Sequence, residues 1–188
     1  MSKEDMKTIK YVAFLRGIGP GDSRKSNVSL CNLFSSLGYS NVRSFISSGN
    51  ILFESSEKDS VKLETEIEQA FEQKLKLKCA TFIRSEAELA EFIKTAPFGD
   101  LQHESKSYLI VTFIKKGKFD RRVELPKSGS NSFRILSFDK NISAFCSVVD
   151  TTTSKTPDFM LKLESHYGKD ITTRTWNTIN RAFAKLVK

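Results

Sequence analysis

The hydrophobic positions in the first half of the chain change from a continuous run to helical spacing. Residues 8–15 form a nearly unbroken apolar run with aromatic side chains, which is typical of a strand covered on both faces and central in its sheet. Apolar side chains then recur at helical spacing between Asn27, the expected N-cap, and Gly38, the glycine expected to end the helix. The patterns predict a central strand followed by an amphipathic helix.

A hairpin and a second helix are predicted next. Residues 42–46 and 51–54 have the pattern of two strands joined by the turn Ser-Ser-Gly-Asn. A long helix is expected from Asp59 or Ser60, because apolar residues recur there on one face, and a further strand is expected at residues 79–83. The resulting order, βαββαβ, is that of the ferredoxin-like unit, whose first and third strands are central antiparallel neighbours.

The second half shows the same kinds of pattern in the same order. A capping box at residues 85–88 opens a helix that ends before Pro97 and bridges to a second unit. The predicted elements of that unit are strands at residues 108–114, 133–138, 142–149 and 170–172, a short helix near 119–124, and helices beginning at Pro157 and near Trp176. We therefore expect an α+β protein of two ferredoxin-like units with antiparallel sheets, plus a bridging helix and a C-terminal helix. The expected domains are residues 1–84 and 85–188.

The predicted strand order brings two polar stretches of the first unit together. Arg16 and Gly17 follow the first strand, whereas Ser48, Gly49 and Asn50 precede the third. Because these strands are antiparallel neighbours, the end of the first lies beside the start of the third. Arginine offers a planar fork of donors suited to a carboxylate or phosphate, and serine and asparagine add a hydroxyl and an amide. The sequence thus predicts an anion-binding corner at this edge of the sheet.

The loop after the first strand is rich in glycine. Gly17, Gly19 and Gly21 allow the backbone to adopt positive φ and to expose amide groups. A dinucleotide-binding loop is disfavoured, because the helix begins only near Asn27 and the sheet is antiparallel. The plainer alternative stays open, in which the glycines form a connection and Ser-Gly-Asn is only a tight turn.

A second group of polar residues belongs to the second unit. Lys155 follows the predicted third strand of that unit, and Thr173 and Arg174 follow the fourth, so both segments precede helices. Asn177 lies in the next turn. Helix N-termini favour anions, so these residues are candidates for ligand contacts, with simple helix capping as the alternative.

Composition narrows the classes of function. The chain has 188 residues, 39% hydrophobic and 28% charged, as in ordinary globular proteins. Its net charge of +8 is spread among acids, and the predicted third strand lacks the exposed aromatic residues of RNA-recognition domains, so nucleic-acid binding is disfavoured. The three cysteines fit neither a disulfide framework nor a zinc site, and no triad of catalytic residues is evident. No apolar run is long enough for a membrane helix and the first ten residues are polar, which predicts a cytoplasmic protein with no membrane partner.

Three motifs carry a family resemblance: Y-V-A-F-L-R-G-I, V-R-S-F-I-S-S-G-N-I-L-F-E and T-T-R-T-W-N-T. They resemble the bacterial family labelled domain of unknown function 1697, whose members read Y-x-A-x-L-R-G-I-N-x-G-G, S-G-N and T-T-R-N-W-N-T. Gly19, Pro20 and Thr175 depart from that pattern, and the family has asparagine at the first and third of these positions. If those asparagines contact a ligand in the family, this chain has lost two such contacts. The resemblance implies two ferredoxin-like domains and no established function. The matching positions are Arg16, Gly17, Ser48, Gly49, Asn50, Thr173, Arg174, Trp176 and Asn177.

Three classes of function remain. The lead hypothesis is binding of a small anionic ligand that bears a phosphate or a carboxylate. The alternatives are an enzyme acting on a phosphorylated metabolite and an interaction module for a protein or nucleic acid. The residues indicate no particular cofactor and no metal.

Overall fold

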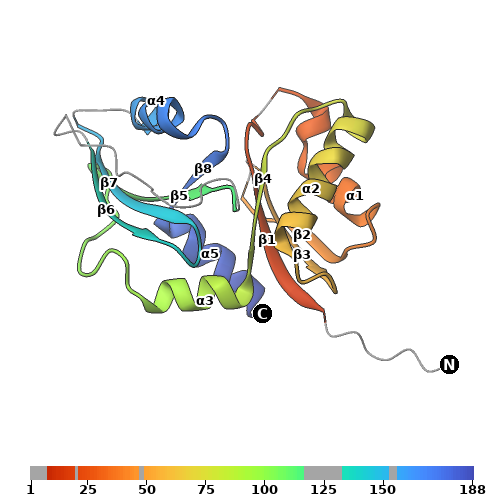
Figure 1. The fold of residues 1–188 in the computed structure, drawn as a ribbon, viewed down its shortest axis with the longest axis horizontal. Helices are drawn as coiled ribbons and strands as arrows, with labels where there is room; N and C mark the ends of the chain where they lie inside the picture. Colours follow the sequence, from red (N-terminus) through yellow and green to blue (C-terminus); the bar gives the residue numbers. More distant parts are fainter. Residues whose placement is uncertain (1–7, 20, 47–48, 117–132, 153–155) are drawn as a thin grey trace. The chain divides into compact units, whose positions relative to one another are not determined.

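The chain divides into two units in a computed structural model (Figure 1). Unit 1 is Met1–Ala87 with Ala184–Lys188, and unit 2 is Glu88–Phe183. The structure describes residues 8–19, 21–46, 49–116, 133–152 and 156–188.

Unit 1 is a four-stranded antiparallel sheet with two helices on one face (Figure 1). Its elements are β1 (Ile9–Leu15), the 3-10 turn η1 (Ser23–Lys25), α1 (Asn27–Ser35), β2 (Ser40–Ser44), β3 (Asn50–Ser55), α2 (Ser60–Ala70), the π-helical turn η2 (Phe71–Leu75) and β4 (Thr81–Ser85). The strand order is β2-β3-β1-β4, so the first and third strands are central neighbours, as predicted.

The core of unit 1 lies between the sheet and its helices. The ring of Phe53 on β3 packs against Tyr11, Phe34 and Tyr39, with centroids 5.5, 5.3 and 4.8 Å away. Aromatic pairs at these separations stabilise a fold beyond their buried area. The cluster fixes α1 and the start of β2 on the two central strands.

The outer edge of β4 is closed by side chains. Glu68 and Glu64 on α2 accept hydrogen bonds from the backbone N–H groups of Thr81 and Ile83, at 2.7 and 2.8 Å. Arg84 is fully buried, donates to the Ile83 carbonyl at 2.7 Å and lies 3.7 Å from the Glu64 carboxylate. These contacts satisfy polar groups that an edge strand would otherwise expose.

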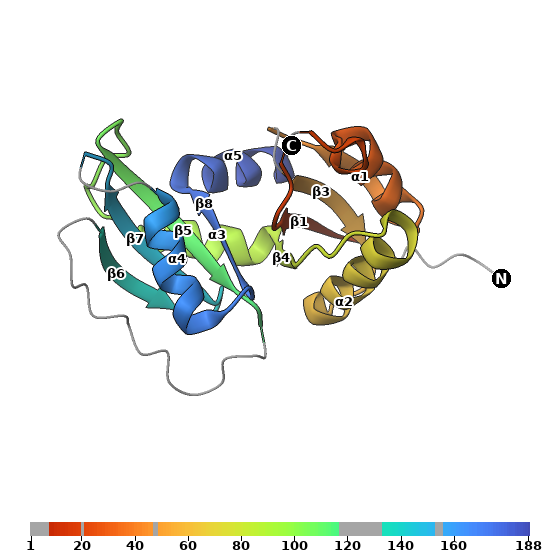
Figure 2. The ribbon, with the colours of Figure 1, turned by 90° about the horizontal axis from the view of Figure 1, so that it is seen from above.

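Unit 2 contains a second sheet with the same strand order. The elements of this half are α3 (Glu86–Lys94), β5 (Ser107–Ile114), β6 (Phe133–Asp139), β7 (Ala144–Asp150), α4 (Thr156–Tyr167), β8 (Ile171–Thr175) and α5 (Trp176–Leu186). The order β6-β7-β5-β8 is again antiparallel throughout. Figure 2 shows α4 against this sheet, where Tyr167 packs on Phe145 with centroids 5.4 Å apart. The short helix predicted near residues 119–124 lies outside the described residues.

The two sheets share one register. Arg84 pairs with Val12 in unit 1, and Arg174 pairs with Val111 in unit 2. The third strands match in the same way, since Asn50 is opposite Phe14 and Ala144 is opposite Phe113. Each unit therefore places an arginine at the same point of its fourth strand, just before a helix. The α+β class with two ferredoxin-like units is confirmed.

Several predicted element boundaries need correction. The N-cap of α1 is Ser26 rather than Asn27, because the Ser26 hydroxyl accepts from the Ser29 N–H at 3.2 Å. The predicted strand at residues 79–83 is shifted to β4. β8 extends to Thr175, because its pairing with β5 continues as far as Ile110, so Thr173 and Arg174 lie within the strand rather than after it.

Candidate functional site

The loop after β1 returns to the start of β3. The Leu15 N–H donates to the Gly49 carbonyl at 2.8 Å. Gly49 has φ +72°, and a Cβ there would lie 2.9 Å from the Cβ atoms of Leu15 and Ile18. This close approach requires glycine. The structure therefore brings the backbone of Arg16 beside Gly49 and Asn50, as the topology predicts, and we call this set, with Gly17, the corner. Ser48 lies outside the described residues.

The backbone of Arg16 is also fixed from the other side, by the segment that leads into β4. Its N–H donates to the Ala80 carbonyl at 2.8 Å, and its carbonyl accepts from the Cys79 thiol at 3.3 Å. Asn50 is only 2% exposed and pairs with Phe14. Its carbonyl accepts from the Phe45 N–H at 3.1 Å, which closes the loop between β2 and β3. The corner is therefore held by β1, by the segment before β4 and by the loop between β2 and β3.

The glycines of the loop do not all behave alike. Gly17 and Gly21 have φ +75° and +98°, but Gly19 does not adopt positive φ, which corrects the expectation for that residue. The Lys25 ammonium donates to the Gly17 carbonyl at 3.0 Å. Asp22 caps η1, and its hydrogen bonds with the Arg24 side chain lower the pKa of its carboxyl. Polar contacts within the loop therefore fix the segment of residues 22–25 and hold Lys25 against Gly17.

The hairpin turn beside the corner contains an unusual backbone conformation. Ile46 has φ +54°, a left-handed value that a β-branched side chain rarely adopts. Strained backbone of this kind is concentrated at functional sites. The strain lies two residues after the end of β2 and on the approach to Gly49, so it falls within the corner's own turn.

The unit 2 candidates lie on β8 and the first turn of α5. Arg174 is half-buried. Its Nη1 atom donates to the Thr172 hydroxyl at 2.9 Å and to the Thr173 carbonyl at 2.8 Å. The Thr173 hydroxyl bonds to Thr112 at 2.8 Å and to the Met160 sulfur at 2.7 Å, so it is engaged inside the unit. Asn177 is exposed. Lys155 lies outside the described residues.

Sequence reasoning missed Arg84 and its partner on α2. The signal was the arginine before a helix in both T-F-I-R-S and T-T-R-T, which the shared register shows to be equivalent. The helix position that contacts this strand differs between the units: Glu64 accepts from the Ile83 N–H, whereas Met160 accepts from Thr173.

A surface depression of ≈ 380 Å³ is lined by Tyr39, Glu54 and Glu66 among others. The Tyr39 hydroxyl donates to Glu66 at 2.6 Å, and burial together with this carboxylate raises the pKa of Tyr39 above its ordinary value. An acidic depression does not suit an anion, so this part of unit 1 is set apart from the corner.

Two further findings concern the described part of the chain. Among these residues, no helix is long and apolar enough to cross a membrane. No three or more His, Cys, Asp or Glu side chains gather there in a way that would hold a metal ion. The cysteines are free thiols, with Cys79 and Cys146 buried and Cys31 half-buried.

Comparisons with known proteins agree with the motifs and the fold. The model of the family described as Protein of unknown function (DUF1697) matches residues 8–135. A solved structure, that of the conserved bacterial protein SP0830 from Streptococcus pneumoniae, is 21% identical with a TM-score of 0.74, and the match covers 97% of this chain and 100% of that chain. At this identity the likeness shows the fold alone. A comparison with curated proteins gave no match. Because the family match spans more than half of the sequence, the chain belongs to the DUF1697 family of proteins of unknown function.

Proposed function

We propose that the corner of unit 1 binds a small anion that bears a phosphate or a carboxylate. The observation that carries the proposal is the close approach of Gly49 to Leu15 and Ile18, which brings the loop that begins at Arg16 against the turn that leads into Asn50. A guanidinium fork and an amide, next to a loop with positive φ at Gly17, form donor groups suited to such a ligand. Ser48 would add a hydroxyl from the same turn.

Arg174 is proposed as a second arginine for anion binding, on unit 2. The equivalent Arg84 is fully buried beside the Glu64 carboxylate, so its charge is balanced within the protein. Arg174, in contrast, is partly exposed. Of the two equivalent arginines, we therefore assign ligand binding to Arg174 and a structural role to Arg84. Lys155 and Asn177 are proposed to assist Arg174. The cytoplasmic location stays a prediction.

The test is a thermal-shift screen with inorganic phosphate, pyrophosphate, sugar phosphates, nucleotides and citrate. A ligand at a hundredfold its Kd stabilises the folded protein by about 2.7 kcal/mol, which raises Tm measurably. We expect at least one anion to raise Tm, and Arg16→Gln to abolish the increase. The backbone hydrogen bonds of Arg16 to Ala80 and Cys79 do not depend on its side chain and remain in the variant.

The matched control is Arg134→Gln, which removes an equal charge from an exposed position on β6. This variant should respond to the anion like the original protein. Equal loss of the anion-induced increase in Tm in both variants would mean a general charge effect. Full anion binding by a folded Arg16→Gln protein would refute the corner as the anion site.

A further inference from the structure

Two segments of unit 1 run side by side at the edge that holds the corner. The first is residues 16–26 and the second is residues 72–79. Arg24 donates through Nη1 to the Leu75 carbonyl at 3.3 Å, and the Cys79 thiol donates to the Arg16 carbonyl at 3.3 Å. These contacts join the loop after β1 to the connection between α2 and β4 at two points.

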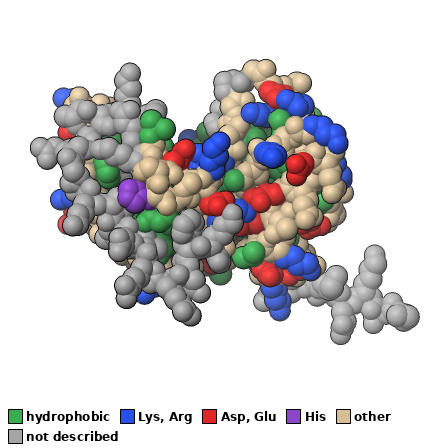
Figure 3. All heavy atoms as spheres, turned by 45° about the horizontal axis from the view of Figure 1, so that its top comes forward, with side chains coloured by type: hydrophobic (Ala, Val, Ile, Leu, Met, Phe, Trp, Pro, Cys, Tyr) green, Lys and Arg blue, Asp and Glu red, His purple; other side chains and the backbone are tan. Residues whose placement is uncertain are grey.

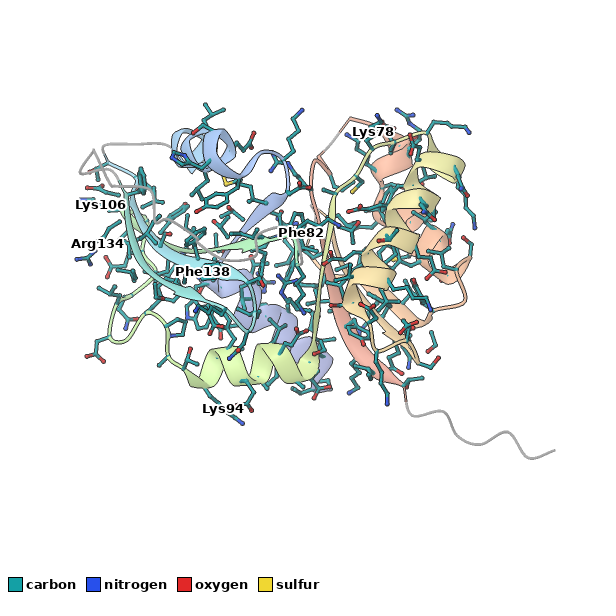
Figure 4. The ribbon with its side chains drawn as sticks, in the orientation of Figure 1. Lys78, Phe82, Lys94, Lys106, Arg134 and Phe138 are labelled. Carbon is teal, nitrogen blue, oxygen red and sulfur yellow. The ribbon has the colours of Figure 1, made fainter. Side chains whose placement is uncertain are left out.

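The two segments concentrate positive charge. They contain six cations against two carboxylates, so they carry four of the eight net positive charges of the chain. We call the six cations the basic edge: Arg16, Arg24, Lys25, Lys74, Lys76 and Lys78. Figure 3 shows Lys and Arg side chains gathered on the upper part of unit 1, and Figure 4 places Lys78 at that end of the unit.

The three lysines of the second segment are exposed, because they alternate with residues that are partly or fully buried. Lys74, Lys76 and Lys78 are exposed, whereas the residues between and after them, Leu77 and Cys79, are half-buried and buried. Beside Lys74 lies a depression of ≈ 300 Å³ that is also lined by the polar residues Ser29, Asn32 and Ser36. The Lys74 ammonium donates to the Ser36 hydroxyl at 2.7 Å, which directs it along the rim of this depression.

The chemistry of the basic edge suits phosphates better than a protein surface. Protein interfaces are built around buried aromatic or apolar anchors. None of the large apolar side chains exposed in the described part of the chain belongs to either segment. Interfaces with nucleic acid are polar and strongly positive instead. The sequence alone disfavours nucleic acid because its cations are spread along the chain, but the fold brings six of them to one edge. We propose that the basic edge binds a nucleic-acid strand through its phosphates.

Binding of this kind is independent of base sequence. Base recognition on a ferredoxin-like sheet needs aromatic rings exposed on the central strands. Here the rings of Tyr11, Phe14 and Phe53 are at most 2% exposed, so they offer no surface on which bases could stack. Contacts to phosphates alone make affinity fall steeply with salt and leave it insensitive to sequence.

The test is fluorescence anisotropy with two labelled single-stranded RNAs of equal length and different sequence, titrated at several salt concentrations. We expect both RNAs to bind alike. The double variant Lys76→Gln/Lys78→Gln should bind about tenfold more weakly at low salt, with a log–log salt slope shallower by about 1.4, because two phosphate contacts are lost. Both lysines are exposed, so the unfolding temperature should stay unchanged.

The control variant is Lys58→Gln/Lys94→Gln, which removes the same charge from exposed positions outside the basic edge. It should bind RNA like the original protein. Absence of RNA binding at low salt would overturn the proposal, and so would an equal loss of RNA affinity in the test variant and the control variant. Displacement of RNA by tripolyphosphate at equal phosphate concentration would also overturn it, in favour of a free phosphate chain. The thermal shift with small anions should be lost in Arg16→Gln and kept in Lys76→Gln/Lys78→Gln, so failure of either proposal is visible separately.

Discussion

At the scale of single residues, the corner depends on a glycine that no other residue can replace without strain. Gly49 combines φ +72° with a Cβ position 2.9 Å from Leu15 and Ile18. Gly168, at the end of α4, has a similar φ of +62° but open space around it. Alanine substitutions at the two glycines therefore separate the cost of a left-handed backbone from the cost of steric crowding.

Gly49→Ala should destabilise the fold more than Gly168→Ala. Both variants lose about 1–2 kcal/mol from the left-handed backbone, and Gly49→Ala should lose about 1–3 kcal/mol more from crowding. Urea unfolding at equilibrium measures both changes. Equal destabilisation in the two variants would show that the loop does not press on Gly49.

At the scale of elements, the two fourth strands are closed differently. β4 has a buried arginine and a glutamate that also accepts from its backbone, whereas β8 has a partly exposed arginine and a methionine from α4. A buried charge whose partner is removed is strongly destabilising, while removal of both charges is far milder. Arg84 and Arg174 should therefore differ sharply in their effect on stability.

Arg84→Met should reduce the free energy of unfolding by about 3–5 kcal/mol, because Glu64 is left buried without its cation. Arg174→Met should cost clearly less. The double variant Arg84→Met/Glu64→Gln, which keeps an oxygen for the Ile83 N–H, should recover at least half of the loss. Urea unfolding of the two single variants and the double variant measures this coupling. If the effects of Arg84→Met and Glu64→Gln on the free energy of unfolding simply add in the double variant, the two side chains are not coupled.

Sequence reasoning succeeded where a pattern is local and failed where a contact is tertiary. The continuous apolar runs of β1 and β5 indicated central strands, and the order of elements then fixed the neighbours of each. Arg84 was missed because an arginine inside an apolar strand gains its partner only when α2 packs beside it. The end of β8 was placed too early because polar Thr173 and Arg174 are held in the strand by pairing with β5.

At the scale of the whole molecule, the two units have the same strand order and the same register. The shared register puts equivalent arginines in both units, and Val12 and Val111 face them. The units differ in their polar groups: the glycine-rich loop and the basic edge belong to unit 1, and the arginine assigned to ligand binding on the fourth strand belongs to unit 2. The features proposed to bind ligands are therefore those in which the two units differ, and the shared register provides only their common framework.

The most direct measurement is an NMR titration of the amide-labelled protein with the anion that gives the largest thermal shift. We expect saturable shifts of the amides of Gly17, Gly49 and Asn50, with the same apparent Kd, and their loss in Arg16→Gln. Lys58 and its neighbours, outside the corner, should stay unshifted. Saturable shifts confined to other residues, or unchanged shifts in Arg16→Gln, would contradict the corner as the anion site.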